Sequence, residues 1–119
     1  MPDPNPPIVK VSFDPDDDPQ FRFDDETVRM TQAGIVVLVQ RGRAKKWEFQ
    51  GAEVKNDTLG QFSAAVLGNG NTVVIDDRFR DETIKAYSYY VTVLEAGETY
   101  RSPDPVIVND PGGQLTAGA

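Results

Sequence analysis

Short runs that alternate between hydrophobic and polar residues recur along the chain, and clusters of Gly, Pro, Asn and Asp separate them. In the first run, residues 8–13, every second residue can face one side while Lys10 and Ser12 face the other. A period of two residues is typical of a β-strand with one buried face. Helical periodicity is hard to find elsewhere, so the pattern predicts an all-β fold.

One run departs from this alternation. Residues 35–39 read Ile-Val-Val-Leu-Val and are apolar at every position. The run is short for a helix and rich in β-branched residues, which favour strands. It therefore predicts a central strand that is buried on both faces.

Further strands are expected wherever short apolar runs lie between turn residues. The tetrapeptide Gly68-Asn69-Gly70-Asn71 predicts a hairpin, because Asn-Gly adopts the positive φ angles that primed turns require. The alanines at 64 and 65 leave a helix open for the arm before this turn. The remaining predicted strands cover residues 46–50, 62–67, 72–75, 86–94, 99–101 and 106–108, with short edge pieces at 21–23 and 27–30 and a short element at 52–54.

Together these elements predict a two-sheet antiparallel immunoglobulin-like sandwich of about seven strands. The chain length of 119 residues suits one domain, which we place at residues 8–108. Residues 1–7 and 109–119 are rich in Pro, Gly and small residues, so they are expected to be a flexible N-terminal segment and a flexible C-terminal tail.

The last part of the chain resembles a known family. Residues 87–108 are similar to the last hairpin of fibronectin type III domains, with Tyr-x-Tyr-x-Val-x-Val, a Gly-containing turn, a Ser and an apolar β-branched run. The resemblance implies that Trp47 packs between the two sheets. It also implies that Tyr87 hydrogen-bonds back to the chain as a tyrosine corner.

A second resemblance concerns repeated Asp-Pro pairs, which stand at positions 3–4, 14–15, 18–19, 104–105 and 110–111. These pairs resemble the small bacterial family known as DP-EP. That resemblance implies an immunoglobulin-like fold and no particular activity.

The composition narrows the range of functions. The chain contains no cysteine and no histidine, so thiol nucleophiles, Ser-His-Asp triads and thiolate or imidazole sites for transition metals are excluded. A net charge of −7 disfavours nucleic acid and anionic membranes as partners. The basic cluster Arg-Gly-Arg-Ala-Lys-Lys at 41–46 is an exception, and it is expected to be a solvated loop or to dock an acidic partner.

The start of the chain lacks the basic and apolar regions of a signal peptide. A cytoplasmic protein is therefore expected, although a mature secreted fragment would have the same sequence features.

The acidic stretch after the first strand is a candidate calcium site. Asp14, Asp16 and Asp18 repeat the spacing of a calcium loop, and Asp25 stands at its twelfth position. Pro19 occupies the position at which an EF-hand needs Gly, so that motif is rejected. Two hypotheses remain, an irregular calcium site and a solvated turn in which the aspartates cap the loop.

Tyr90, Tyr100 and Arg101 form the candidate binding surface. The two tyrosines fall on neighbouring strands of one predicted hairpin, so a cross-strand aromatic pair is expected. An exposed pair of this kind would suit a carbohydrate ring or a protein partner.

The carboxylates at 76–77 and 81–82 raise a further hypothesis, because two carboxylates can carry out glycoside hydrolysis. These residues fall at predicted strand ends, where polar loop chemistry explains them. We therefore expect no catalytic residues.

The function predicted from the sequence is that of a non-enzymatic protein-interaction or structural module, without a cofactor. Its edge strands or end loops would contact a protein partner or a second copy of the chain. An edge formed by residues 106–108 is one such candidate, although Pro103 and Pro105 oppose pairing there. The alternative is a calcium- or carbohydrate-binding domain.

Overall fold

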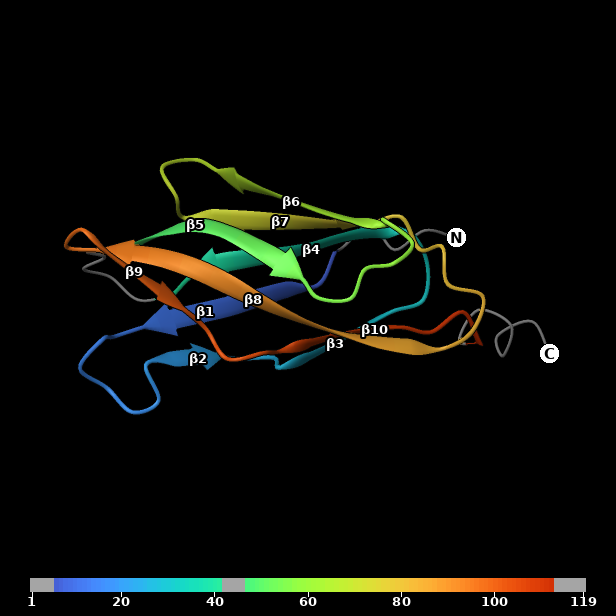
Figure 1. Ribbon diagram of the computed structural model, residues 1–119, viewed down its shortest axis with the longest axis horizontal. Coiled ribbons are helices and arrows are strands. Elements are labelled where there is room, and N and C mark those ends of the chain that lie inside the picture. Colours follow the sequence, from blue (N-terminus) through green and yellow to red (C-terminus); the bar gives the residue numbers. More distant parts are fainter. Residues whose placement is uncertain (1–5, 42–46, 113–119) are drawn as a thin grey trace.

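The computed structural model describes residues 6–41 and 47–112, which form ten β-strands in two packed sheets (Figure 1). Most of the predicted basic cluster, and most of the predicted terminal segments, lie outside the described residues. The strands are β1 (Ile8–Phe13), β2 (Phe21–Phe23), β3 (Thr27–Met30), β4 (Gly34–Gln40), β5 (Trp47–Val54), β6 (Phe62–Leu67), β7 (Thr72–Asp77), β8 (Lys85–Glu95), β9 (Glu98–Arg101) and β10 (Val106–Asn109).

Sheet I has the strand order β2-β1-β4-β7-β6, and sheet II has the order β3-β10-β8-β5 with β9 also paired to β8. In Figure 1, β5, β8 and β9 of sheet II lie in front of sheet I. The predicted all-β sandwich is confirmed. Within the described residues, no helix has the length and apolarity needed to cross a bilayer.

The predicted strand count and the purely antiparallel pairing are wrong in detail. Residues 21–23 and 27–30, expected only as short edge pieces, form strands of their own, and this brings the described total to ten. Two pairs are parallel, β1 with β4 and β3 with β10. In both cases the chain passes through other strands before it returns beside its partner, and such a connection allows parallel pairing.

Residues from both sheets meet in one hydrophobic core. Trp47 is buried, with its ring edge-on to Phe49 at 5.1 Å and to Phe13 at 5.9 Å between ring centroids. Phe13 belongs to sheet I, so Trp47 packs between the sheets as the family resemblance implied. Aromatic pairs with this edge-to-face geometry stabilise a core beyond their buried area.

The central strand β4 is buried on one face only. Val36 and Leu38 are fully buried, whereas Ile35 is 37% exposed, and Val37 and Val39 are partly exposed. The expectation that both faces are buried is therefore wrong. Sheet II covers the inner face of β4, and no described element covers the outer face.

The prediction that residues 106–108 form an edge strand is also wrong. Strand β10 lies between β3 and β8 and pairs with both. Residues 27–30, a short run, supply the strand that covers it. The predicted break at the prolines is present, because β9 ends at Arg101 and β10 begins at Val106.

The predicted hairpin between β6 and β7 is present, and its turn uses positive φ angles at Gly68 and Gly70. The Gly70 carbonyl also accepts a hydrogen bond from the Phe49 N–H at 2.7 Å, which ties the turn to β5. A Cβ at Gly70 would stand 2.6 Å from the Glu48 Cβ, closer than real atoms approach.

We expect Gly70→Ala to lower the free energy of unfolding by about 2 kcal/mol. The added Cβ would strain a backbone with positive φ and would also clash with Glu48. Gly51→Ala is the matched control, since a Cβ there would meet nothing within 4 Å. Chemical denaturation measures both variants, and equal losses in the two would contradict this account of the turn.

Candidate functional site

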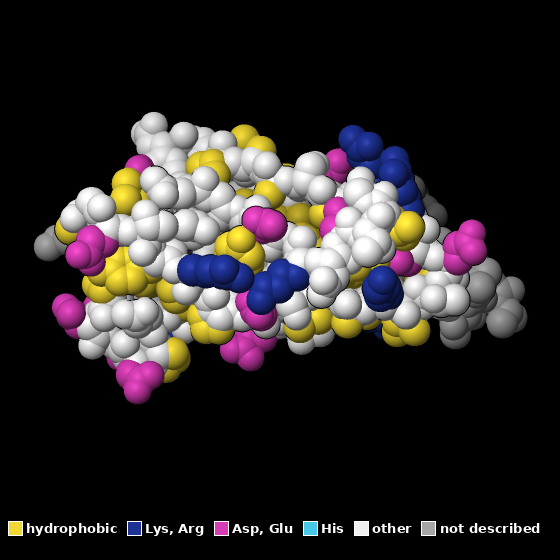
Figure 2. All heavy atoms as spheres, viewed as in Figure 1, with side chains coloured by type: hydrophobic (Ala, Val, Ile, Leu, Met, Phe, Trp, Pro, Cys, Tyr) yellow, Lys and Arg dark blue, Asp and Glu magenta, His cyan; other side chains and the backbone are white. Residues whose placement is uncertain are grey.

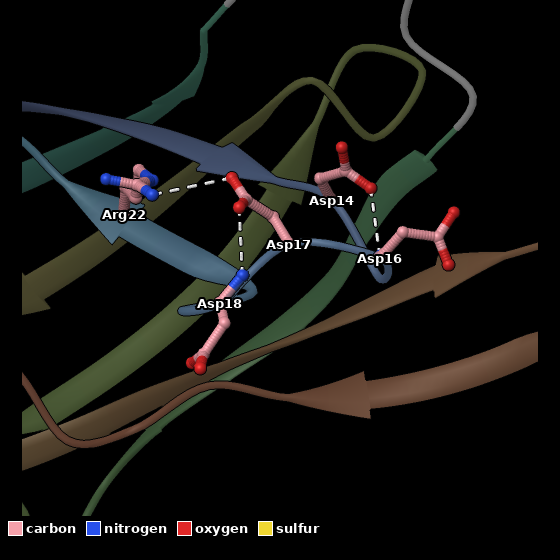
Figure 3. Close-up of polar contacts among 5 residues, drawn as sticks. All are labelled: Asp14, Asp16, Asp17, Asp18 and Arg22. Carbon is pink, nitrogen blue, oxygen red and sulfur yellow. Dashed lines mark hydrogen bonds and ion pairs between the residues drawn. The ribbon is translucent and has the colours of Figure 1, made fainter.

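In the acidic loop between β1 and β2, aspartate side chains accept hydrogen bonds from backbone N–H groups of the same loop. The Asp14 carboxylate accepts a hydrogen bond from the Asp16 N–H at 3.0 Å, and the Asp17 carboxylate accepts one from the Asp18 N–H at 2.9 Å. Asp17 also contacts Arg22 at 3.4 Å. The carboxylates of Asp16 and Asp18 point in different directions (Figure 3).

The fourth predicted calcium ligand, Asp25, precedes β3, where its carboxylate accepts a hydrogen bond from the Thr27 N–H at 3.2 Å. Within residues 6–41 and 47–112, no three acidic side chains are grouped so that they could hold a metal ion. The loop geometry matches the capping hypothesis. The calcium site stays a prediction without a ligand cluster to support it.

Tyr90 lies on the outer face of sheet II, where the Arg101 guanidinium lies 3.8 Å from its ring centroid. The Tyr90 hydroxyl donates to Glu53 at 2.8 Å, and Lys55 pairs with Asp104 at 2.6 Å. Figure 2 shows this side of the molecule, with basic side chains beside acidic ones in its middle. The charges of this cluster are paired with one another, and Arg101 occupies one face of the ring on which a sugar would stack.

Tyr100 is on the opposite side of the same hairpin, so the predicted Tyr90–Tyr100 pair is wrong. In the register of β8 and β9, Tyr100 stands opposite Val93, which faces the core. The Tyr100 ring packs against Phe13 with 4.9 Å between centroids. Residues of one strand face alternate sides, so Tyr90 and Val93 face opposite sides of β8.

A buried polar cluster joins the two sheets at one end. It brings together two of the carboxylates considered for hydrolysis, the tyrosine of the predicted corner, and two residues that the sequence analysis did not single out, Gln61 and Asn109. We call Gln61, Asp77, Asp81, Tyr87 and Asn109 the polar clamp. The Tyr87 hydroxyl donates to Asp81 at 2.7 Å, and the Gln61 amide donates to both Tyr87 and Asp81 at 2.9 Å. The Asn109 amide donates to Asp77 and to Asp81, each at 3.1 Å.

The clamp links β7 of sheet I to β8 and β10 of sheet II. Tyr87 does bond back along the chain, as the family resemblance implied, and its partner is a side chain six residues upstream. One signal in the sequence points to the clamp: Asp77 has the inward parity of Val73 and Ile75, so alternation places a carboxylate on the buried face.

Burial raises the pKa of Asp77, and its hydrogen bonds from Asn109 and Phe79 only partly oppose this effect. Burial also acts to raise the pKa of Asp81, but hydrogen bonds from Tyr87, Gln61 and Asn109 outweigh it and lower that pKa. Such divergence can mark an acid–base pair. Asp77 is completely buried, however, so its carboxylate cannot meet a substrate, and the clamp is better explained as structural.

The outer face of sheet I is the remaining candidate. Ile8, Val37, Val74 and Ala65 stand opposite one another across β1, β4, β7 and β6. Further apolar side chains flank this row, and the exposed large apolar members of the face are Ile8 at 56%, Leu67 at 48% and Ile35 at 37%. Among the outward residues of these four described strands, only Lys10 and Asp76 are charged.

The model of the DP-EP family matches residues 3–111. The match covers almost the whole chain and includes every strand described above. No curated protein matches the chain.

The polar clamp predicts opposite pH effects for its two carboxylates. The raised pKa of Asp77 means that its stabilising contribution is complete below pH 3.8 and is lost as the pH rises through the folded-state pKa. The lowered pKa of Asp81 means that its contribution is present above pH 3.8 and is lost as the pH falls through its folded-state pKa.

Urea denaturation from pH 3 to pH 7 tests this difference. The free energy of unfolding of Asp77→Asn, taken as the difference from that of the unmodified protein, should be more favourable to the variant at pH 7 than at pH 4. Asp81→Asn should lose about 1 kcal/mol at pH 7, because a charged acceptor is removed from a partly exposed site, and the loss should shrink in acid. Parallel pH profiles for the two variants would refute the assignment.

Proposed function

We propose that this chain, which belongs to the DP-EP family, is a non-enzymatic protein-interaction module whose contact surface is the outer face of sheet I. The observation that carries the proposal is β4, which is apolar at every position from Ile35 to Val39 although one of its faces is uncovered. A strand with one solvent-facing side normally carries polar residues on that side.

The pairing of the strands places the apolar outward residues of β4 beside apolar outward residues of its neighbours. The apolar row runs across four neighbouring strands, from Ile8 on β1 to Ala65 on β6. Single exposed apolar side chains are common, but contiguous apolar patches usually mark an interaction site. Burial of such a surface is favourable by roughly 25 cal/mol per Å² of apolar area.

The outer face of sheet II provides an internal comparison. There, Tyr90, Arg101 and Glu53 bind one another, and Lys55 pairs with Asp104. The polar side chains of that face therefore bond to one another. The apolar side chains on the outer face of sheet I cannot form such bonds, and no described element covers them. The calcium and carbohydrate alternatives have less support, because the acidic loop caps itself and Arg101 covers one face of the Tyr90 ring.

Photo-crosslinking in cells of the natural host tests the proposal. A benzophenone amino acid at position 37, in the apolar row, should form covalent protein adducts. The matched control is position 92 on β8, which is also partly exposed and which faces outward from sheet II. Adducts from position 37 and none from position 92 are expected; no adducts from position 37, or equal yields from both positions, would contradict the proposal.

A further inference from the structure

The two charged side chains at the outward positions of β1, β4, β7 and β6 are placed symmetrically about Val37. Lys10 on β1 stands beside Val39, two residues after Val37 on β4. Asp76 on β7 stands beside Ile35, two residues before Val37. Strands β1 and β7 flank β4 on opposite sides, so Lys10 and Asp76 occupy opposite corners of the patch with Val37 midway between them.

This placement is self-complementary. Consider a two-fold axis that lies in the plane of the interface, passes through Val37 and is perpendicular to the line from Lys10 to Asp76. Rotation about it lays a second copy face to face on the first and exchanges the two corners. Lys10 then meets Asp76 of the second copy, and Asp76 meets Lys10 of the second copy, around an apolar centre.

We infer that the partner of this face is a second copy of the same chain, packed sheet on sheet with two reciprocal Lys10–Asp76 contacts. The inference rests on the proposed function and names its partner. Within the described part of the chain, neither Lys10 nor Asp76 forms an ion pair, so both are available for such contacts.

Charge favours this face over the other surfaces for self-association. Two copies that each carry a net charge of −7 repel one another in general. At the outward positions of β1, β4, β7 and β6, one positive and one negative side chain meet their opposites, and the other outward residues of these strands are neutral. Arg22, which faces outward on β2, contacts Asp17 of its own chain. Electrostatic complementarity of this kind fixes the register of an interface.

The size of the patch sets the expected strength. Four strands spaced by roughly 4.8 Å, with about five residues along each, cover roughly 20 by 17 Å. This is roughly 340 Å² on each copy, less than half of the roughly 800 Å² per partner of a standard stable interface. The dimer should therefore dissociate on dilution.

Sedimentation velocity on the full chain, from micromolar to millimolar concentration, tests the inference. The mass should rise from 13.1 kDa toward about twice that value. Lys10→Glu places like charges together at both contacts and should weaken dimerisation about tenfold or more, and Asp76→Lys should do the same. The double variant Lys10→Glu/Asp76→Lys should restore dimerisation, because it exchanges the two charges.

Lys85→Glu is the control for net charge, because it makes the same change at an exposed site on β8 in sheet II and should leave dimerisation unchanged. Circular dichroism checks that each variant is folded. A dimer that the double variant fails to restore would overturn the arrangement. A chain that stays monomeric at all concentrations would overturn the second copy as partner. If position 37 nevertheless crosslinked to a different protein, the interaction module would stand and only its self-association would fall.

Discussion

The two-residue period of the β-strand is the constraint on which this structure depends. When Val36 and Leu38 of β4 face the core, the residues between them must face the other way. A two-sheet sandwich buries only the inner face of each sheet, so the outward residues of a central strand stay uncovered unless another molecule covers them. The apolar outer side of β4 follows from the sequence, and its exposure follows from the fold.

The polar clamp complements this apolar packing. Hydrophobic contacts hold the sheets together without fixing their relative position, whereas buried hydrogen bonds require particular partners. Gln61, Asp77 and Asn109 are buried at one end of the sandwich. Gln61 donates to Tyr87, and Asn109 of sheet II donates to Asp77 of sheet I and to Asp81. A buried group that loses its partner is costly, so the clamp opposes sliding of one sheet over the other.

Local patterns predicted local structure well and long-range partners poorly. The strand at 8–13, the inward Trp47 and the hairpin at 68–71 all depend on neighbouring residues, and all are confirmed. The hydrogen bond of Tyr87 and the inward parity of Asp77 could be predicted for the clamp, but the parts played by Gln61 and Asn109 could not, because these two residues meet across 48 residues. The Tyr90–Tyr100 pair failed because the register of β8 and β9 places these two rings on opposite faces. For the candidate site, the sequence indicated that residues 35–39 need cover on both faces, but only the sheet order shows which face lacks it.

The central claim is that the outer face of sheet I binds a second copy of the chain, and amide NMR spectra recorded at low and high protein concentration test it most directly. The account predicts that the amide signals that move with concentration belong to β1, β4, β7 and β6, with the largest changes around Val37. Signals from β5, β8 and β9 should stay in place. Concentration-dependent shifts confined to sheet II, or the absence of any shift up to millimolar concentration, would contradict it.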